Sequence, residues 1–309
     1  MTLNFYDSEL SSHLANNMSI YSIKDLEQLS GIKAHTLRIW EQRYEILKPD
    51  RTDTNIRTYD DKDLKLVLNI ALLKAHGHKI SEISKMASNE LSKEVLLISE
   101  KQLSYPEQIH ALTISMLDLD EERFEKIIST NTLQFGFENM MINIIFPFLS
   151  RIGTLWVTGS VNPAQEHFIS NLIRQKLIVA IDGQLPSLRI GAKKYLLFLP
   201  EGEMHEISLL FGNYIIRSRH NKVIYLGQSL PFNELIFAHK VHKPDYLLTV
   251  ITSVPAQEEV QKYVYQLAKE FPDSRILLSG QQVVAQDIIC PDNVDILPQI
   301  HYLAAIASE

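Results

Sequence analysis

Five short apolar runs, rich in β-forming residues, alternate with helix-patterned segments in the last part of the chain. The runs cover residues 195–199, 222–226, 246–251, 275–278 and 294–297. Between them, apolar side chains recur at helical spacing, as in Ile207, Leu210, Phe211, Tyr214 and Ile215. Strands joined by helical crossovers pair in parallel, because each crossover returns the chain to the same end of the sheet. The alternation predicts a flavodoxin-like, Rossmann-like five-strand parallel sheet over residues 189–309.

The turn after the first run carries a histidine within the sequence Glu203-Met204-His205-Glu206. In a doubly wound sheet, turns that lead from a strand into a helix lie outside the carboxyl ends of the strands, where ligands bind. We therefore expect the imidazole of His205 to face a ligand crevice rather than the core. A histidine that is merely solvated on a surface loop is the alternative, and the pattern alone leaves both open.

Residues 89–188 are predicted to form a bundle of about four helices. Residues 88–106 read as a linker-rich boundary, and amphipathic patterns then cover 106–117, 121–135 and 137–156. Pro147 is expected to kink the last of these. A further helix begins with Asn162 as its N-cap, Pro163 at its first position and Gln165 three residues after the cap, a capping-box arrangement.

The turn between the last two helices of the bundle brings three side chains of interest together. Trp156 ends one helix, and Glu166 and His167 lie in the first turn of the next. We expect these side chains to converge on one edge of the bundle, and that edge to face His205. Taken alone, a tryptophan near a helix end is more often core, and a Glu-His pair in a first turn is more often a surface feature.

Residues 19–88 are predicted to form a DNA-binding head. Ser22 is a plausible N-cap for a short helix that Gly31 ends, and a second helix follows over residues 34–44. Two short helices joined by a glycine turn make a helix-turn-helix, whose second helix enters the major groove of DNA. Trp40 is expected to anchor this small domain from its core.

Several side chains of the head are suited to contact DNA. Guanidinium groups can hold phosphates, and polar side chains at the start of a recognition helix can reach base edges. Glu41 and Glu45 flank one of these arginines and can instead hold it on the protein surface. The residues expected to contact DNA are His35, Thr36, Arg38, Arg43, Arg51, Arg57 and Tyr59.

Charge is unevenly distributed along the 309 residues. The net charge of -7 argues against nucleic acid binding when taken alone, but residues 19–88 hold 12 Lys+Arg and 10 Asp+Glu, a net of +2. A locally less acidic head is compatible with a DNA surface made of a few well-placed cations. The single cysteine, Cys290, excludes an intramolecular disulfide and a cysteine zinc cluster. The polar N-terminal tail, residues 1–18, and the strand-length apolar runs predict a cytoplasmic protein without a membrane span.

The head resembles the winged helix-turn-helix of the MerR family of transcription regulators. The segment Arg38-Ile39-Trp40-Glu41-Gln42-Arg43-Tyr44 is similar to the family's Thr-x-Arg-x-Trp-Glu-x-Arg-Tyr recognition helix, and Arg57-Thr58-Tyr59 to the Arg-x-Tyr that closes its wing. The resemblance covers residues 19–88. It implies a double-stranded DNA operator as partner, a homo-oligomer (dimer or tetramer) that reads paired half-sites, and RNA polymerase as a further candidate partner.

The turn at His205 resembles the cobalamin-binding signature Asp/Glu-x-His-x-x-Gly. The resemblance implies cobalamin as cofactor, with adenosylcobalamin as the expected form. It also implies that His205 is the lower axial ligand of cobalt and that Glu203 holds the other ring nitrogen. Ser208 stands where the family has glycine. On the later strands, Thr249 to Ile251 stands in place of a Ser-x-Leu that holds the nucleotide tail, and Ser279-Gly280 in place of a Gly-Gly.

Trp156, nine residues, then Glu166-His167 is similar to the Trp-x9-Glu-His signature of CarH/LitR-type light-sensing MerR regulators. In that family the bundle caps the upper face of adenosylcobalamin. The resemblance therefore implies cofactor contacts from Trp156, Glu166 and His167. Val157 departs from the family, whose photoreceptors carry a histidine directly after the tryptophan that ligates cobalt once light has cleaved the cobalt-carbon bond.

Two classes of function compete on this basis. The first is a transcriptional regulator, expected to be a repressor, whose oligomeric state and DNA binding are controlled by cobalamin and by light. The second is a regulator of the same architecture that has lost cobalamin and responds to a partner protein or another ligand, which Ser208, Val157 and Ser279 favour. An enzyme is the remote third, because cobalamin-dependent enzymes of this type need a substrate barrel in addition to the three modules.

Overall fold

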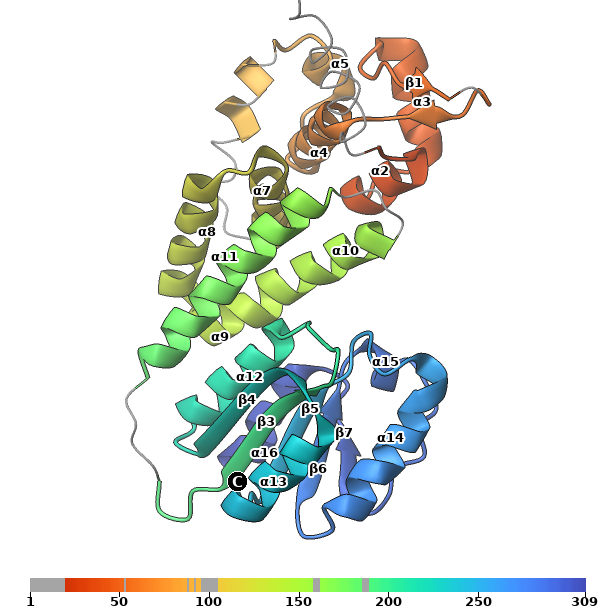
Figure 1. Cartoon of the computed structure of the whole chain (residues 1–309). Coiled ribbons are helices and arrows are strands. Elements are labelled where there is room, and N and C mark those ends of the chain that lie inside the picture. The colour runs from red at the N-terminus through yellow and green to blue at the C-terminus, as the bar shows by residue number, and fades with distance from the viewer. Residues whose placement is uncertain are drawn as a thin grey trace, which may run out of the picture. The chain divides into compact units, whose positions relative to one another are not determined.

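The structure, a computed structural model, describes residues 20–52, 54–87, 89–91, 93–95, 105–157, 162–184 and 189–309, and of 154–157 the backbone alone. The chain divides into two compact units, Met1–Ile169 and Ser170–Glu309 (Figure 1). The boundary between them falls inside one helix, α11 (Pro163–Asp182). Within the described ranges, no helix combines the length and the apolar character that a membrane span requires.

The first unit begins with the predicted helix-turn-helix. Helices α2 (Ile23–Ser30) and α3 (Ala34–Tyr44) have the bounds that the sequence indicated. Ser22 caps α2 in a reciprocal capping box with Asp25, and Gly31 ends it at φ 72°. This left-handed conformation is one that glycine adopts without strain, so the turn between the two helices is encoded locally.

The wing and two further helices complete the head. Strands β1 (Asp50–Arg51) and β2 (Arg57–Thr58) form an antiparallel ribbon. Helix α4 (Asp61–Ala75) starts at an N-cap, Asp60, and α5 (Ile80–Ile83) follows. Of the predicted linker, residues 89–91 and 93–95 are helical, and 88, 92 and 96–104 lie outside the described residues.

The helical bundle contains α7 (Tyr105–Asp118), α8 (Glu121–Phe135), α9 (Phe137–Met140), a π-helical turn η1 (Met141–Ile145), α10 (Phe146–Val157) and α11. The π turn ends two residues before Pro147, where a kink was predicted. Proline lacks an amide hydrogen and its ring meets the carbonyl four residues earlier, and a wider turn relieves both problems. Asn162 caps α11 as expected, since its Oδ1 accepts the Ala164 amide at 2.8 Å.

Within the first unit, the head is packed against the bundle through α4. Lys65 Nζ lies 2.6 Å from Asp118 Oδ2 at the end of α7. The carboxylate of Asp61, the first residue of α4, accepts the Tyr21 hydroxyl at 2.7 Å and the Gln165 amide at 3.1 Å. Gln165 is 6% exposed and belongs to the first turn of α11. The start of α11 and the start of α4 are therefore in direct contact.

The second unit is built on the predicted parallel sheet, with strand order β4-β3-β5-β6-β7. The strands are β3 (Lys194–Pro200), β4 (Lys222–Leu230), β5 (Tyr246–Val250), β6 (Arg275–Ser279) and β7 (Val294–Ile296). The chain moves outward from β3 to β4 and then crosses back to β5 on the other side of β3. The topological switch point therefore lies between β3 and β5, the place where such sheets bind ligands.

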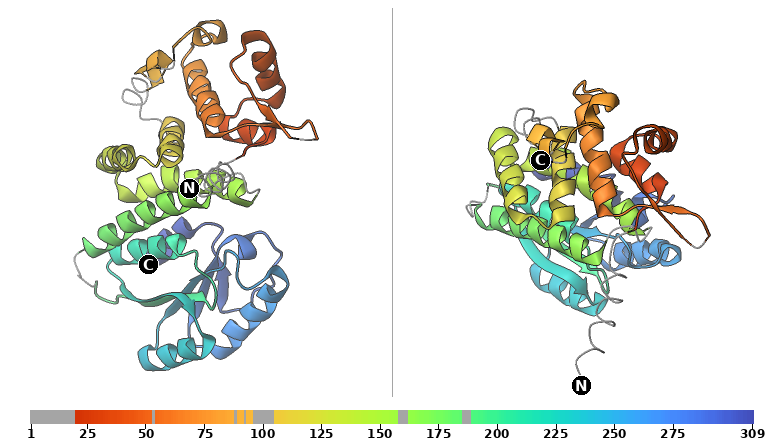
Figure 2. Two further views of the ribbon diagram at one scale, coloured as in Figure 1. Left: turned by 45° about the horizontal axis from the view of Figure 1, so that its top comes forward. Right: turned by 90° about the horizontal axis from the view of Figure 1, so that it is seen from above.

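Helices cover both faces of this sheet (Figures 1 and 2). Alternate residues of β3, Leu196 and Phe198, pack in one core with α13 (Phe232–His242) and α14 (Gln257–Glu270). Helix α12 (Ile207–Ser218) packs with the C-terminal η2 (Ile300–Tyr302) and α16 (Leu303–Ser308). The short helix α15 (Gln281–Val284) follows β6. Burial on both faces explains why the strands read as continuous apolar runs.

Candidate functional site

The loop between β3 and α12 places His205 at the switch point of the sheet. Its Nδ1 lies 2.6 Å from Oε1 of Glu203. The side chain of Glu203 is fully buried, whereas that of His205 is 53% exposed. Because Nδ1 faces the carboxylate, a bond from His205 to a metal would form through Nε2.

The carboxylate of Glu203 is held by backbone amides from two loops. Oε1 accepts the amides of Met204 at 2.9 Å and His205 at 3.0 Å, within its own loop. Oε2 accepts three successive amides of the loop that follows β5, from Thr252 at 3.0 Å, Ser253 at 2.7 Å and Val254 at 3.0 Å. One buried carboxylate thus ties together the two loops that border the switch point.

These contacts decide the charge of Glu203. Burial acts to raise the pKa of its carboxyl group, but the hydrogen bonds from His205 and from the backbone amides of Ser253 and Val254 outweigh burial. The pKa of Glu203 is therefore held far below its ordinary value of 4.5. A permanently ionised carboxylate beside Nδ1 fixes the tautomer of the imidazole and makes Nε2 a better electron-pair donor.

Other residues hold the same loop, and the sequence did not single them out. Ser253 Oγ lies 3.3 Å from His205 Nδ1, so this serine joins the Glu203 and His205 pair. Gln228 donates its side-chain amide to the Met204 carbonyl at 2.6 Å. The position of Ser253 just after β5, at the carboxyl end of a strand beside the switch point, could have identified it from the sequence. Gln228, on the edge strand β4, had no sequence signal.

Glu206, the residue after His205, is also buried, at 7% exposure. Its Oε1 accepts the Nε–H of Arg174 from α11, and its Oε2 accepts the hydroxyl of Tyr225 from β4 at 3.0 Å. The hydrogen bond with Glu206 raises the pKa of Arg174, and burial together with the Glu206 charge raises the pKa of Tyr225. Both partners therefore keep their protons and donate to Glu206.

The residues predicted to hold a nucleotide tail lie at the carboxyl ends of β5 and β6. Thr249 and Ile251 are fully buried, and Thr249 Oγ1 has no hydrogen-bond partner among the described residues. Ser279 is buried and donates to the Leu297 carbonyl at 3.1 Å. Gly280 has φ 106°, and a Cβ there would lie 2.3 Å from the Ile251 carbonyl oxygen. Only glycine permits this close approach of the β6 and β5 ends.

The remaining predicted cofactor contacts lie on helices. Ser208 is half-buried in the first turn of α12. In the first unit, Glu166 Oε2 lies 3.3 Å from His167 Nδ1, and the histidine side chain is 74% exposed. The side chains of Trp156 and Val157 lie outside the described part of the structure. The convergence of the Trp156, Glu166 and His167 side chains therefore stays a prediction.

The recognition helix presents its predicted DNA contacts to solvent. His35, Arg38 and Arg43 are exposed on α3, and Thr36 is half-buried. Trp40 is 4% exposed, which confirms its expected place in the core of the head. The guanidinium carbon of Arg43 lies 5.6 Å from the centroid of the Tyr44 ring.

Two wing residues predicted to contact DNA have partners within the head. Arg57 forms an ion pair with Glu41 at 3.0 Å, so this arginine braces the ribbon against α3. Tyr59 is 2% exposed, its backbone pairs with Tyr21, and its ring belongs to the core of the head. The DNA contacts of both residues stay predictions. Arg51 is exposed, with Nη1 2.6 Å from Asn55 Oδ1 in the same wing.

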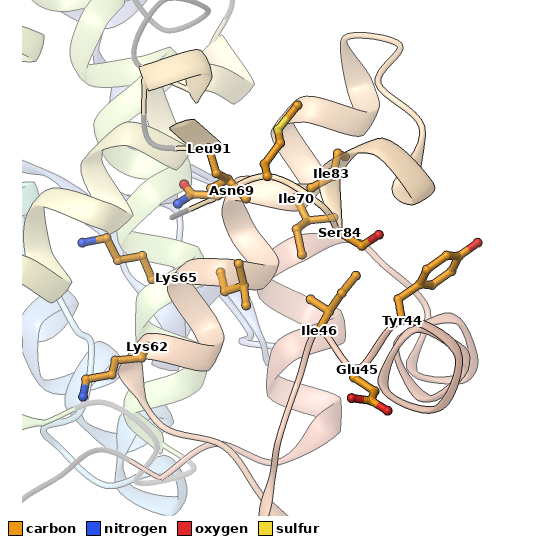
Figure 3. A pocket seen from close by; sticks show the side chains of 12 residues that line it. Tyr44, Glu45, Ile46, Lys62, Lys65, Asn69, Ile70, Ile83, Ser84 and Leu91 are labelled. Carbon is orange, nitrogen blue, oxygen red and sulfur yellow. The ribbon is translucent and has the colours of Figure 1, made fainter. Parts of the chain in front are cut away.

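The head also contains a pocket of about 410 Å³ between the end of α3, α4 and α5 (Figure 3). Its walls include the apolar side chains of Ile46, Ile70 and Ile83. Lys65 on its rim is engaged by Asp118. Asn69 also lines the pocket, and its buried Oδ1 atom has no hydrogen-bond partner among the described residues. None of the residues predicted to contact DNA lines this pocket.

Comparison with known proteins finds two family models that match parts of the chain. Residues 21–90 match the family model described as MerR HTH family regulatory protein, and residues 108–180 match the model described as B12 binding domain. The first match covers the head, and the second runs from α7 into α11. The fold is therefore a MerR-type winged helix-turn-helix, a helical B12 binding domain and a five-strand parallel sheet.

Among curated relatives, the chain is similar to the HTH-type transcriptional repressor CarH of Myxococcus xanthus, with 27% identity over 77% of this chain and 81% of that protein. It is similar to the repressor CarA of the same organism, with 25% identity over 77% of this chain and 78% of that one. Among solved structures, it is similar to the Methanosarcina barkeri monomethylamine corrinoid protein, with a TM-score of 0.49 and 10% identity over 63% of this chain and 94% of that chain.

Proposed function

We propose that the chain, which joins a MerR-type helix-turn-helix head to a B12 binding domain, is a DNA-binding transcriptional regulator controlled by cobalamin. The pairing of His205 with the buried carboxylate of Glu203 carries the proposal. A histidine that ligates a metal usually donates its other ring N–H to a carboxylate or carbonyl. Here that arrangement stands at the switch point of a parallel sheet, where ligands bind.

The residues present fit a corrinoid at two points. His205 would bind the cobalt of a corrinoid through Nε2, because its Nδ1 faces Glu203. The buried Thr249 hydroxyl, which has no partner among the described residues, would gain one from a polar nucleotide tail at the end of β5. The donor set and this buried hydroxyl therefore suit the same cofactor.

Each predicted residue then has a role in holding the cofactor. Glu203 orients the imidazole of His205, and Thr249, Ile251, Ser279 and Gly280 lie at the strand ends that would border the tail. Ser208 replaces the glycine of the signature in the first turn of α12. Trp156, Glu166 and His167 would cover the upper face, as the sequence resemblance implies.

The output of the protein is DNA binding by the head. We infer that a homo-oligomer, a dimer or a tetramer, binds a double-stranded operator and represses transcription, with RNA polymerase as a further partner. The relatives described as transcriptional repressors support this inference. When bound, adenosylcobalamin supplies a cobalt-carbon bond that light cleaves. We infer that the cofactor controls the oligomeric state and that light acts through this bond.

One observation favours a second function. Ser279 stands where the resemblance expects glycine, and its buried hydroxyl is already bonded to the Leu297 carbonyl at 3.1 Å. If the Ser279 side chain occupies the space that the nucleotide tail needs, cobalamin cannot bind. The chain would then be a regulator that responds to a partner protein or to another ligand. Absorbance of the purified protein after incubation with adenosylcobalamin and gel filtration separates the two. Retained cobalamin supports the first function, and its complete absence supports the second.

A further inference from the structure

Glu206 holds the His205 loop through a second set of contacts, separate from those of Glu203. The two carboxylates flank His205 in sequence, and both are buried. Glu203 is held in the second loop by the backbone amides of Thr252, Ser253 and Val254 and by the Ser253 hydroxyl. Glu206 differs, because its partners are two side chains from separate elements, Arg174 of α11 and Tyr225 of β4. The position of the His205 backbone is thus set from two sides.

The Arg174 contact is the one that reaches the loop from α11. Arg174 donates through Nε and keeps its side chain 49% exposed, whereas the Glu206 side chain is 8% exposed. A buried carboxylate that loses its cationic partner is left with an uncompensated charge, and the surrounding backbone moves to reach water. Removing Arg174 should therefore disturb Glu206, which follows His205 in the chain, and with it the backbone of His205.

We propose that Arg174 is a positioning residue for His205, acting through Glu206 to set the direction in which the imidazole presents Nε2 to its ligand. The proposal deepens the cobalamin-dependent function and rests on it.

A simpler role for Arg174 is structural: it would hold the second part of α11, residues 170–182, in place within the second unit. With a structural role alone, loss of Arg174 would lower the stability of the protein but leave the orientation of the His205 imidazole unchanged. The test therefore needs readouts at His205 itself. Suitable variants are Arg174→Gln, Arg174→Lys, which keeps the charge but not the planar guanidinium, and Tyr225→Phe, which removes the second partner of Glu206. The matched control is Arg217→Gln on α12, because Arg217 Nε donates to a neutral group, Asn213 Oδ1, at 2.9 Å.

The first readout uses the full chain without cofactor. Amide hydrogen exchange at Met204 and His205 reports opening of the loop, because both amides donate to Glu203. Arg174→Gln should speed exchange at these amides by about tenfold, the smallest change expected from loss of one charge-assisted hydrogen bond. Arg174→Lys should restore part of the protection, Tyr225→Phe should have a smaller effect, and Arg217→Gln should match wild type. Exchange that is unchanged in Arg174→Gln overturns the proposal.

The second readout is the spectrum of the protein loaded with adenosylcobalamin and titrated with acid. Protons compete with cobalt for the imidazole, so a misplaced His205 is displaced at a higher pH. Arg174→Gln should raise the displacement midpoint by about one pH unit, the equivalent of a tenfold weaker bond. A midpoint equal to that of wild type contradicts the proposal. If wild type binds no cobalamin, the proposed function fails, and the exchange measurement still decides the role of Arg174.

Discussion

The Nδ1 atom of His205 lies 2.6 Å from Oε1 of Glu203, a carboxylate that also accepts backbone amides from the loops after β3 and β5. The imidazole is therefore oriented by the two loops that border the switch point of the sheet. When a ligand-binding side chain is already held in place, ordering that side chain costs less free energy on binding. We expect the His205 site to be formed before cofactor binds.

Replacing Glu203 by glutamine tests how strongly this carboxylate holds the two loops. In Glu203→Gln, one carboxylate oxygen is replaced by an NH₂ group, which is a hydrogen-bond donor. Backbone amides that donate to that oxygen in wild type would then face a donor, and at least one of them would have no acceptor. The free energy of unfolding should fall by about 1–3 kcal/mol, measured by urea denaturation. Glu201→Gln changes an exposed carboxylate in the same loop and should have little effect. Equal stability of the two variants would show that Glu203 does not hold the loops.

The same variant should change how stability depends on pH. The pKa of Glu203 is lowered in the folded protein, so its contribution is complete above the ordinary pKa of 4.5 and is lost as pH falls toward the folded value. Between about pH 5 and pH 3, the unfolding free energy of wild type should therefore fall more steeply than that of Glu203→Gln. Parallel curves over this range would contradict the lowered pKa.

Much of this arrangement could be predicted from sequence because its signals are local. The alternation of apolar runs defined all five strands, and Ser22 and Gly31 marked the ends of α2. The histidine turn was recognisable because Glu203 and His205 are two residues apart. Pro147 predicted a distortion, although the form it takes, a π turn, depends on how the bundle packs around it.

The remainder depends on contacts that no local pattern contains. Ser253 lies 50 residues beyond Glu203, and Arg174 lies 32 residues before Glu206. Their meeting follows only from the crossover that places β5 beside β3 and from the packing of α11. The burial of the Tyr59 ring was not predicted, because the Arg-x-Tyr pattern does not reveal which side chains beside a short strand are buried.

Recognition of DNA should depend on the exposed arginines of α3. Arg38→Ala should weaken binding to operator DNA and reduce the salt slope of the affinity by about one. Fluorescence anisotropy at several salt concentrations measures both quantities. Lys262→Ala removes an exposed cation from α14, in the α/β domain, and should leave them unchanged. If Arg38→Ala and Arg43→Ala both bind as wild type does, α3 is not the helix that enters the groove.

The hydrogen bond between Gln165 and Asp61 should couple the bundle to the head. Gln165→Leu removes it and leaves the half-buried Asp61 with one side-chain partner fewer, at a cost of about 1 kcal/mol. A double-mutant cycle with Asp61→Asn, followed by thermal unfolding, measures the coupling energy. Gln134→Leu, an exposed substitution on α8, serves as control. Additive effects of Gln165→Leu and Asp61→Asn would mean that the contact does not couple the two elements.

Val157 should determine how the protein behaves after illumination. Valine offers no metal-binding atom, so the lit state of wild type should lack the second histidine ligand that the sequence resemblance implies for this position. His167 is the remaining imidazole nearby in sequence. In spectra recorded in the dark after a light pulse, Val157→His should hold its lit form longer than wild type. Equal decay of the two spectra would show that position 157 has no part in the response, and His167→Ala tests whether His167 substitutes.

Uptake of adenosylcobalamin tests the central claim most directly. Purified wild-type protein is incubated with adenosylcobalamin in the dark, separated by gel filtration, and assayed for cobalt and for its absorbance spectrum. His205→Ala removes the proposed ligand, and His242→Ala, an exposed histidine at the end of α13, is the control. Wild type and His242→Ala should retain the cofactor with the spectrum of an imidazole-ligated cobalamin, and the affinity of His205→Ala should fall by at least about 100-fold. Wild type that elutes without cobalt, or His205→Ala that binds as tightly as wild type, would contradict the account.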